Sequence, residues 1–523
     1  MSEFSKQLDK FKYEEDDKLS SDIKIIDNSI HITNNNLELS ELSPEQLYAY
    51  RKFIKGENLF ITGSGGTGKT HLIKYFTKFA NSINKKIQVC AMTGCAAILL
   101  ECNARTLHSW SGIKLAKGTK ESVVSSVIHN KHSVKSWKSS NILILDEVSM
   151  LSKKVFEIIE KIARILKKDP RPFGGMQVIF TGDFFQLPPV SNNDDPESSL
   201  FCFESPIWNN LFKIENQIEL KTIFRQTDDI YINILQQIRH GNLDDKNKEI
   251  LNKYVKRSYD SNNTNGCIPT KLFPLRSKTD YINSIMFKKI KEEEFVFETI
   301  RNVDNSVYID SKKPIPFDII KKASMLSEKE ITYELDLLTN SISAPQVLRL
   351  KKGAAVMCTV NLDMENSICN GSQGIIIDIK RREDKYLPVV KFSNGIEKLI
   401  ELYSWQSEEF PTLSIQQVPL CLAWALTIHK IQGATLNMAE MDIGQSIFEY
   451  GQTYVALSRI KSLDGLYLSD FNSKKICANP KVIKFYKTLL KNDILEKEDN
   501  KNTITELKEE AYENNKDIKI IKL

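Results

Sequence analysis

Short apolar runs alternate with amphipathic stretches between about residues 42 and 215 of the chain. Each run is bounded by turn-forming or polar residues and is too short for a helix, which is typical of a strand buried on both faces. The stretches between the runs carry apolar residues at the spacing of a helix that packs on a sheet. The alternation predicts a doubly wound α/β fold with parallel strands at Leu59–Thr62, Ile87–Met92, Ile142–Leu145 and Gln177–Thr181.

Two helices in this region can be placed more closely. Ser43, Pro44 and Gln46 predict a helix start, with Ser43 as the N-cap, Pro44 at the first helical position and Gln46 as the capping-box partner. Apolar positions at helical spacing then follow at Leu47, Tyr50, Phe53 and Ile54. A second helix is predicted after Met150, with an apolar face formed by Phe156, Ile159, Ile162 and Ile165.

The pattern changes in the second half of the chain. A second α/β sheet is predicted to start near Glu219 and to resume around Leu420. Between about 284 and 418, glycines punctuate short β-rich segments, which favours a small barrel inserted into the second α/β domain. These glycines are Gly353, Gly371, Gly374 and Gly395. The predicted domains are a flexible lead-in (1–40), a first α/β domain (41–215), a second (216–284 and 419–490), the inserted domain (285–418) and a charged tail (491–523).

Composition adds little to this picture. The formal net charge of +5 is compatible with a nucleic-acid partner without requiring one. The nine cysteines form no CxxC pair and the seven histidines complete no zinc spacing, so we expect a reducing compartment and no structural zinc. No apolar stretch approaches the roughly 20 residues of a membrane span, and the charged N-terminus has no apolar core for a secretory signal. We therefore expect a soluble intracellular protein.

The strongest local signal is a phosphate-binding loop. Residues 63–70 read Gly-Ser-Gly-Gly-Thr-Gly-Lys-Thr, which satisfies G-x-x-x-x-G-K-[ST] between a predicted strand and a predicted helix. Glycines let backbone N–H groups surround a phosphate at the positive end of the helix. Lys69 would reach the β- and γ-phosphates, and the Thr70 hydroxyl would ligate Mg²⁺. The residues predicted to bind ATP here are Gly63, Gly65, Gly66, Thr67, Gly68, Lys69 and Thr70.

An apolar strand that ends in two acids supplies the other half of such a site. Asp146 and Glu147 directly follow the run Ile142–Leu145. Asp146 would hold the Mg²⁺ shell, and Glu147 would orient and deprotonate the attacking water. Together with the phosphate-binding loop, the acids predict an NTPase that uses ATP and Mg²⁺.

Further segments resemble the motifs of superfamily 1 helicases, in the order in which those enzymes carry them. These segments are Leu42–Gln46, Ala91–Ala97, Thr106–Trp110, Thr181–Val190, Phe224–Gln226, Ala423–Gly433 and Tyr454–Arg459. The stretch from Asp146 through Pro172–Gly175 to Val190 closely resembles the signature of the Pif1 family. The resemblance to that family spans about Leu42 to Leu468, which is most of the chain.

The resemblance implies a role for each matching side chain. Gln46 would read the adenine edge, and Gln186 would sense the γ-phosphate and link it to the DNA groove. Arg225 and Arg459 would reach the γ-phosphate across a cleft, and the pair Gln432–Gly433 would lie on the nucleotide side. The residues implied to contact DNA are Thr93, Gly94, Thr106, His108, Asn361, Thr427 and His429. For Trp110, base stacking and a place in the core both remain open.

The fold implied by the family is two RecA-like motor domains, with a strand-separating wedge at about 111–138 inserted in the first and an SH3-like barrel in the second. Such a protein would be a monomeric, ATP-dependent 5′-to-3′ helicase in DNA replication, repair or recombination. It would act on single-stranded DNA and its junctions with duplex, in the cytoplasm, the nucleus or a viral replication compartment. The main alternative is a DNA-dependent ATPase that remodels protein–DNA complexes without processive unwinding. A scaffold with a degenerate site and a small-molecule kinase are both disfavoured, because the acids and arginines are intact and because a kinase would not need the later motifs.

Overall fold

The computed structural model describes residues 41–489, with gaps at 101, 103, 115, 191–194, 260–268, 304–307, 310–312, 315–322, 343, 364, 367, 384, 408–409, 411 and 429–430. The predicted lead-in at 1–40, the predicted tail at 491–523 and the candidate DNA contact His429 lie outside the described residues. All elements named below belong to the unit Ser43–Leu523.

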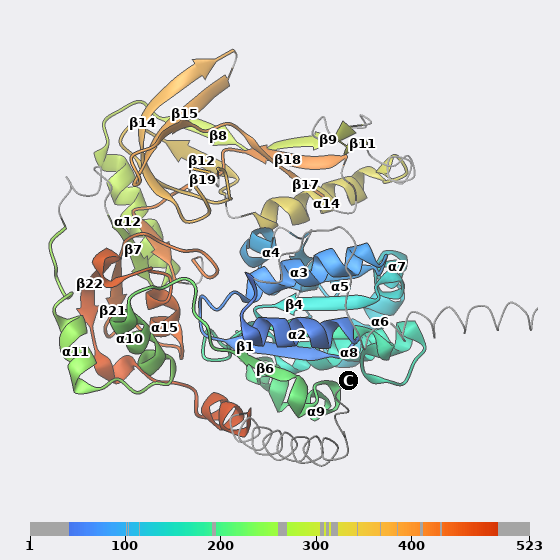
Figure 1. The fold of residues 1–523 in the computed structure, drawn as a ribbon. Helices are drawn as coiled ribbons and strands as arrows, with labels where there is room; N and C mark the ends of the chain where they lie inside the picture. The colour runs from blue at the N-terminus through green and yellow to red at the C-terminus, as the bar shows by residue number, and fades with distance from the viewer. Residues whose placement is uncertain are drawn as a thin grey trace, which may run out of the picture. The chain divides into compact units, whose positions relative to one another are not determined.

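The first sheet has six parallel strands in the order β3-β2-β4-β5-β1-β6. The strands are β1 (Leu59–Gly63), β2 (Ile87–Ala91), β3 (Arg105–Thr106), β4 (Ile142–Asp146), β5 (Gln177–Thr181) and β6 (Gln217–Leu220). The four predicted runs are thus confirmed as strands, and β1 and β4 are buried along their whole length. The helices around this sheet (Figure 1) include α2 (Pro44–Ile54), α3 (Lys69–Ser82), α4 (Gly94–Leu100), α5 (Leu107–Ser111), α8 (Lys153–Lys167) and α9 (Ile207–Leu211).

Helix α2 begins as its sequence predicts. The Ser43 hydroxyl accepts from the Gln46 N–H at 3.3 Å, and the Gln46 side-chain oxygen accepts from the Ser43 N–H at 3.0 Å. For α8 the predicted apolar face was wrong at one position, because the Ile165 side chain is 43% exposed while Phe156, Ile159 and Ile162 are fully buried. At 100° per residue Ile165 points about 120° away from Ile159, and Leu166 takes the buried position instead.

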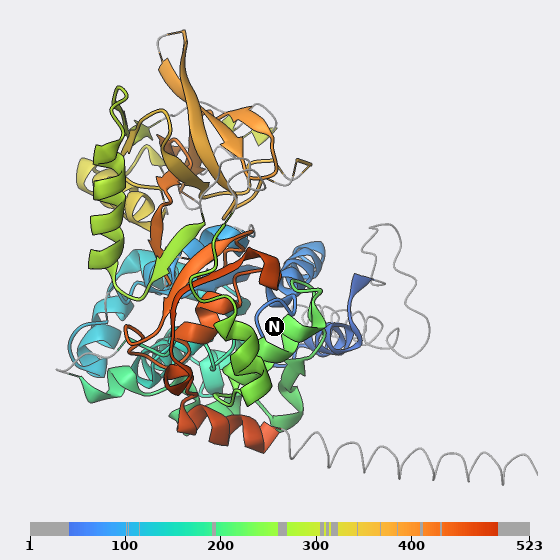
Figure 2. The same ribbon diagram turned by 90° about the vertical axis from the view of Figure 1, so that its left-hand side faces the viewer.

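A second, separate sheet has four parallel strands in the order β20-β7-β21-β22 (Figure 2). Its strands are β7 (Thr270–Phe273), β20 (Ala425–Thr427), β21 (Ala439–Ile443) and β22 (Leu466–Phe471). The helices that accompany it are α10 (Asp229–Arg239), α11 (Asp245–Asn252), α12 (Arg276–Lys289) and α15 (Gln452–Leu457).

The two predicted edges of the second sheet were wrong. Glu219 lies in β6, which pairs with β1 and so completes the first sheet. At the other edge, Leu420 begins β19 (Leu420–Leu422), which pairs antiparallel with β13 (Ala355–Cys358), so the parallel sheet resumes only at Ala425. Both strands are short and lie at the ends of their sheets, where the apolar signal is weak.

Antiparallel sheets lie between the two parts of the second parallel sheet in the sequence. Five strands pair in the order β16-β15-β14-β13-β19, and three more in the order β17-β18-β9. Their bounds are β9 (Ile300–Val303), β14 (Gln373–Arg382), β15 (Lys385–Phe392), β16 (Glu397–Leu399), β17 (Tyr403–Gln406) and β18 (Leu413–Gln417). Two-stranded pairs join β12 (Val347–Leu350) to β8 (Phe295–Glu298) and β10 (Tyr308–Ile309) to β11 (Lys313–Pro314), and the helix of this region is α14 (Glu328–Ser341).

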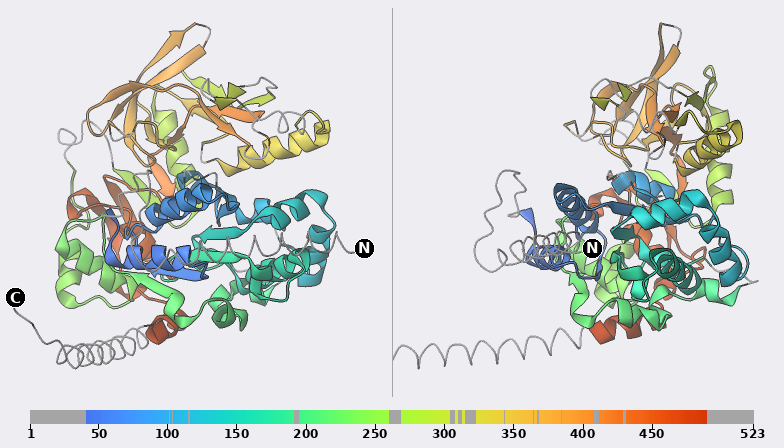
Figure 3. Two further views of the ribbon diagram at one scale, coloured as in Figure 1. Left: turned by 45° about the vertical axis from the view of Figure 1, so that its right-hand side comes forward. Right: turned by 90° about the vertical axis from the view of Figure 1, so that its right-hand side faces the viewer.

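The predicted insertion at about 111–138 is helical. Helices α6 (Lys120–Ile128) and α7 (Lys131–Ser139) pack on each other and on α8 (Figure 3). The ring of Trp137 is fully buried 4.4 Å from that of Trp110, and its indole N–H donates to the Ser111 carbonyl at 3.0 Å. Trp110 therefore belongs to the core that joins this insertion to the first sheet, which rules out base stacking by its ring.

Candidate functional site

The predicted phosphate-binding loop connects β1 to α3. Gly63, Gly66 and Gly68 have φ angles of +142°, +92° and +77°, which residues with a side chain rarely adopt. The Lys69 ammonium donates to the carbonyl oxygens of Gly63 at 2.8 Å and Ser64 at 3.1 Å, so it lies over the loop. Burial lowers the pKa of Lys69, while three nearby carboxylates raise it. A cation held among backbone groups at a helix start is the chemistry that binds a polyphosphate.

The predicted adenine-side residue lies beside this loop. The Gln46 side-chain amide donates to the carbonyl oxygens of Thr67 at 3.2 Å and Gly68 at 3.4 Å. The capping box of α2 holds its oxygen, so the start of one helix fixes the orientation of the amide against the loop that begins another. The Gly68 position is crowded, since a Cβ there would lie 2.5 Å from the Gln46 amide nitrogen.

The two predicted acids lie at the carboxyl end of β4. Asp146 accepts hydrogen bonds from the Thr181 hydroxyl on β5 and from the Glu147 N–H at 2.9 Å. Glu147 has a left-handed φ of +57°, and its carboxylate accepts from the Gln432 amide at 3.1 Å. Burial raises the pKa of both acids, and the charge of Asp146 raises that of Glu147 further. A carboxylate with a raised pKa beside a cation is suited to accept a proton from water.

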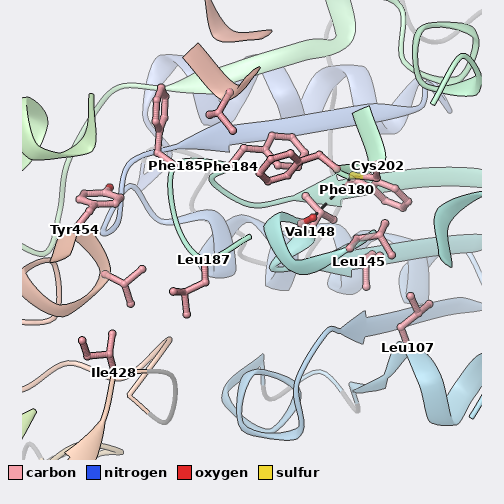
Figure 4. Packing of buried hydrophobic residues seen from close by; sticks show 14 of the residues in the cluster. Leu107, Leu145, Val148, Phe180, Phe184, Phe185, Leu187, Cys202, Ile428 and Tyr454 are labelled. Carbon is pink, nitrogen blue, oxygen red and sulfur yellow. Dashed lines mark hydrogen bonds between the residues drawn. The ribbon is translucent and has the colours of Figure 1, made fainter. Parts of the chain in front are cut away.

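Behind these acids the first sheet is tightly packed. Figure 4 shows Leu145, Phe180 and Phe184 among the buried side chains, with the Cys202 thiol donating to the Val148 carbonyl at 3.9 Å. This rigid support fixes the strand ends that carry Asp146 and Thr181.

The segment Phe224–Gln226 lies directly on the phosphate-binding loop. The Phe224 N–H donates to the Gly66 carbonyl at 2.8 Å, and the Arg225 guanidinium donates to the Ser458 carbonyl at 3.0 Å. Burial and the nearby Arg459 charge lower the pKa of Arg225 to about 9. Gln226 donates to the same Ser458 carbonyl at 3.2 Å, which ties this segment to the end of α15.

Arg459 and Gln186 meet inside the protein. The Arg459 guanidinium donates to the Gln186 side-chain oxygen at 3.4 Å and to the Val455 carbonyl at 3.1 Å. Arg459 is 2% exposed and Gln186 is 4% exposed. Burial lowers the pKa of Arg459, while Glu147 raises it. Two guanidinium groups, of which that of Arg459 is fully buried, and the half-buried Lys69 ammonium therefore face the phosphate-binding loop, and such cations fit a bound polyphosphate.

The candidate DNA contacts on the first sheet lie at helix starts. The Thr93 hydroxyl accepts from the Ala96 N–H at 3.2 Å at the start of α4, and the Thr106 hydroxyl accepts from the Ser109 N–H at 3.3 Å at the start of α5. Ala91 of β2 pairs in parallel with Thr106, so both helices start at the same edge of the sheet. Such neighbouring helix starts are suited to phosphate contacts. His108 is half-buried on α5, and burial lowers its pKa.

The remaining DNA candidates come from later in the chain. The Asn361 side-chain oxygen accepts from the Asn370 N–H at 3.1 Å, and Thr427 ends β20. A Cβ at Gly433 would lie 2.7 Å from the Leu99 methyl group, so Gly433 lies close to the end of α4. The structure brings together the predicted nucleotide-site residues more closely than the predicted DNA contacts.

Two glycines with similar backbone angles allow a matched test of the loop. At Gly66 a Cβ would lie 2.6 Å from the Arg225 Cβ, whereas at Gly56, with φ of +78°, nothing lies within 4 Å. We expect Gly66→Ala to lower kcat/KM for ATP by roughly 10²-fold, because it displaces the loop or Arg225 by about an ångström. Gly56→Ala carries similar backbone strain and should lower the melting temperature alone. Steady-state ATPase assays and thermal melts check both, and equal turnover in the two variants would contradict the close approach at Gly66.

Sequence reasoning missed several polar residues that surround this site. Tyr454 and Asp183 fall inside recognised motifs, but neither was given a role. Arg239 and Tyr486 fall in no motif, and only their three-dimensional contacts reveal them. Among the described residues, no group of three or more His, Cys, Asp or Glu side chains could hold a metal ion.

A phosphate-binding loop on one parallel sheet, faced by arginines from segments that precede or accompany a second parallel sheet, defines a P-loop NTPase fold with two RecA-like domains. The model of the PIF1-like helicase family matches residues 41–249, and that of the DNA helicase Pif1 2B domain matches residues 335–379. The ATP-dependent DNA helicase Pif1 of Bdellovibrio bacteriovorus is 32% identical over 86% of this chain and 92% of its own length. The chain belongs to the Pif1 helicase family.

Solved structures agree with this assignment. Pif1 helicase from Candida albicans is 34% identical, covers 86% of this chain and 99% of its own, and superposes with a TM-score of 0.65. Bacteroides Pif1 helicase in complex with ADP-AlF3 and ssDNA is 27% identical, covers 86% of this chain and 97% of its own, and has a TM-score of 0.55. The chain spans 65% of the zebrafish and 64% of the human ATP-dependent DNA helicase PIF1. No helix in the described ranges is both long and apolar enough to cross a bilayer.

Proposed function

We propose that this protein is an ATP-dependent DNA helicase that moves 5′-to-3′ on single-stranded DNA and unwinds duplex ahead of it. The observation that carries the proposal is the convergence of charged groups from both parallel sheets at one loop. Lys69 and Glu147 come from the first sheet, and Arg225 and Arg459 reach the same place from segments that lead into or belong to the second. A nucleotide bound there would contact both lobes, by which we mean the parts of the chain built on the first and on the second parallel sheet. Its hydrolysis can therefore change how the two lobes meet.

The side chains at this site fit ATP with Mg²⁺. Lys69 and the glycine-rich loop would hold the β- and γ-phosphates, and the Thr70 hydroxyl and Asp146 would hold the metal shell, where Mg²⁺ would supply charge neutralisation. Glu147 would accept a proton from the attacking water, and Arg225, Arg459 and Gln186 would stabilise the charge that develops on the γ-phosphate. Gln46 would read adenine, and Gln432 with Gly433 would close the site from the other lobe.

DNA is the proposed track. Bacteroides Pif1 binds ssDNA together with a nucleotide analogue, which supports the same pairing of ligands here. We place the DNA along Thr93, Gly94, Thr106 and His108, and then along Asn361, Thr427 and His429. Phosphate contacts would dominate the affinity, so binding should weaken steeply with salt and show little sequence preference. Junctions between single-stranded and duplex DNA are the proposed substrates, in replication, repair or recombination.

We also propose a domain organisation that follows from the sheets. The first motor domain would run from 41 to about 220, with the helical insertion at 111–138 as a strand-separating wedge. The second would comprise about 221–284 and 425–490. The antiparallel sheets between them would form the SH3-like barrel of an inserted domain. We expect the protein to act as a monomer.

Two partial duplexes test this proposal directly, one with a 5′ single-stranded tail and one with a 3′ tail. We expect the protein to open only the 5′-tailed duplex and only with ATP and Mg²⁺, because the motor must load on the tail and move toward the junction. Strand separation followed by fluorescence measures both rates. Opening of the 3′-tailed duplex alone would overturn the polarity. No opening of either, with ATPase still stimulated by single-stranded DNA, would favour the alternative function, a translocase that remodels protein–DNA complexes.

A further inference from the structure

A buried carboxylate behind the nucleotide site gathers polar side chains from several elements. Asp183 follows β5 and is 0% exposed. Arg239 at the end of α10 donates to both of its oxygens, at 3.0 and 3.1 Å. The hydroxyls of Tyr454 on α15 and Tyr486 in the helical stretch 480–489 donate to it at 3.2 and 3.4 Å. We call these four residues the Asp183 cluster.

The charged groups of the Asp183 cluster have further hydrogen-bond and ring contacts besides the ion pair itself. The Arg239 guanidinium also donates to Glu219 of β6 at 3.1 Å, and it lies 4.8 Å from the centre of the Phe185 ring. The Tyr486 ring stacks on that of Phe185 at 4.7 Å. These contacts offset the cost of removing charges from water, which an isolated buried pair does not recover. The cluster therefore forms a firm joint between the first sheet and α10, which accompanies the second.

Within the cluster, Tyr454 alone also touches the phosphate-binding loop. Its hydroxyl oxygen accepts from the Gly65 N–H at 2.8 Å and donates its proton to Asp183. Burial first, and the Asp183 charge second, raise the pKa of Tyr454, so the hydroxyl keeps the proton that it donates. One oxygen atom thus connects a backbone group of the nucleotide loop to the buried ion pair.

The segment of α15 and the loop after β5 meet at a second place, next to the contact between Tyr454 and Asp183. Arg459 follows Tyr454 by five residues, and Gln186 follows Asp183 by three. The Arg459–Gln186 contact of 3.4 Å therefore lies beside the Tyr454–Asp183 contact of 3.2 Å. The Arg459 guanidinium also donates to the carbonyl of Val455, the residue after Tyr454, so both side chains are anchored on α15.

We propose that Tyr454 is a positioning residue that links the phosphate-binding loop to Asp183 and thereby sets Arg459 and Gln186 for hydrolysis. The inference rests on the proposed function, because it concerns how that site is assembled. When nucleotide phosphates take up the donors of the loop, the Gly65–Tyr454 bond changes and α15 responds. The phosphate-binding loop and the second lobe then move together, and this movement changes the affinity of the groove for DNA.

Tyr231 on α10 provides a matched control, because it also contacts α15. The Tyr231 hydroxyl on α10 donates to the Leu457 carbonyl of α15 at 2.7 Å, and Tyr231 is 0% exposed. It therefore resembles Tyr454 in burial and also holds α15, but it makes no contact with Asp183 or with the phosphate-binding loop in the hydrogen bonds of the described residues. Tyr231→Phe and Tyr454→Phe each remove one buried hydroxyl and keep the ring.

The test compares these two variants with the wild-type chain in three measurements: kcat and KM for ATP at saturating single-stranded oligonucleotide, the oligonucleotide Kd with and without a non-hydrolysable ATP analogue, and the melting temperature. We expect Tyr454→Phe to lower kcat about tenfold with KM changed less than about threefold, and to abolish the effect of the analogue on oligonucleotide Kd. Tyr231→Phe should melt at a lower temperature but keep the wild-type response of oligonucleotide Kd to the analogue, because among the described residues Tyr231 makes no hydrogen bond to Asp183 or to the phosphate-binding loop.

Equal kcat and equal analogue response in Tyr454→Phe and the wild type would overturn the inference, as would equal losses in both variants, which would show a structural role only. Should Tyr454→Phe fail to fold, Tyr454→4-aminophenylalanine restores a hydrogen-bonding group at the same place. That variant should recover most of the wild-type kcat, and a folded protein without recovery would also overturn the inference. Absence of ATP hydrolysis in the wild-type chain would instead refute the proposed function.

Discussion

Lys69→Ala is expected to abolish ATP hydrolysis and duplex unwinding together while leaving single-stranded DNA binding intact. The ammonium is the one lysine charge on the phosphate-binding loop, and it lies over the Gly63 and Ser64 carbonyl oxygens, where the phosphates would be held. Removing such a preorganised charge from the phosphate-binding loop costs about 10³-fold in kcat. Steady-state ATPase assays, unwinding of a 5′-tailed duplex and oligonucleotide titrations across salt concentrations measure the three properties.

The control for this substitution is Lys78→Ala on the same helix. Lys78 is exposed, and its ammonium lies 5.9 Å from the centre of the Tyr75 ring, away from the loop. Lys78→Ala removes the same charge and the same alkyl chain from α3 as Lys69→Ala. General effects on the stability of the helix and on the electrostatic attraction of DNA are therefore matched. Wild-type turnover in Lys69→Ala would refute the nucleotide site, and a loss of DNA binding equal to the loss of turnover would mean that Lys69 contacts DNA.

The parts of the fold that the sequence predicted well depend on neighbours in the chain. The capping box at Ser43 and Gln46 joins residues three apart, and the glycine-rich loop needs only a strand before it and a helix after it. Asp146 and Glu147 could be placed because the carboxyl ends of parallel strands share one edge of a sheet. Local pattern and simple topology therefore suffice to locate the nucleotide site.

The errors arose where tertiary partners decide the outcome. Glu219 lies in a four-residue edge strand, and only its pairing with β1 decides to which sheet the strand belongs. Its partner in β1 is Thr62, 157 positions earlier in the chain. Ile165 is as apolar as its neighbours, and only its angle about α8 exposes it. Trp110 could have served either DNA or the core, and Trp137 of a different helix settles the matter.

The Asp183 cluster could not have been assembled from sequence. Its members come from a loop, two helices and the stretch near the end of the described chain, and Asp183 and Tyr486 are 303 residues apart. A lone buried arginine such as Arg239 has no sequence signature, since most arginines are exposed. The sequence contains the motifs in which Asp183 and Tyr454 lie. The roles of these two residues can be assigned only from their contacts in the structure.

Glu147→Gln is expected to separate nucleotide binding from hydrolysis. The substitution keeps the shape of the side chain and an oxygen that can accept from Gln432, whose amide lies 3.1 Å from the carboxylate. It removes the group that would take a proton from water, so kcat should fall by roughly 10²–10⁴-fold. Because the contact between the lobes survives, ATP should still bind, and the nucleotide-bound state should accumulate on DNA. Single-turnover hydrolysis and the ATP-dependent change in oligonucleotide Kd measure the two effects separately.

The control is Glu160→Gln, which neutralises another buried acid of the same lobe. Glu160 is 2% exposed on α8 and pairs with Arg164 at 2.7 Å, away from the phosphate-binding loop. It should lower the melting temperature and leave kcat unchanged, because it breaks an ion pair that takes no part in hydrolysis. If Glu147→Gln lost ATP binding as well as turnover, the carboxylate would be a structural support between the lobes and the proton acceptor would have to be sought elsewhere. Retained binding with lost hydrolysis would assign that acceptor to Glu147, at the point where the two sheets meet.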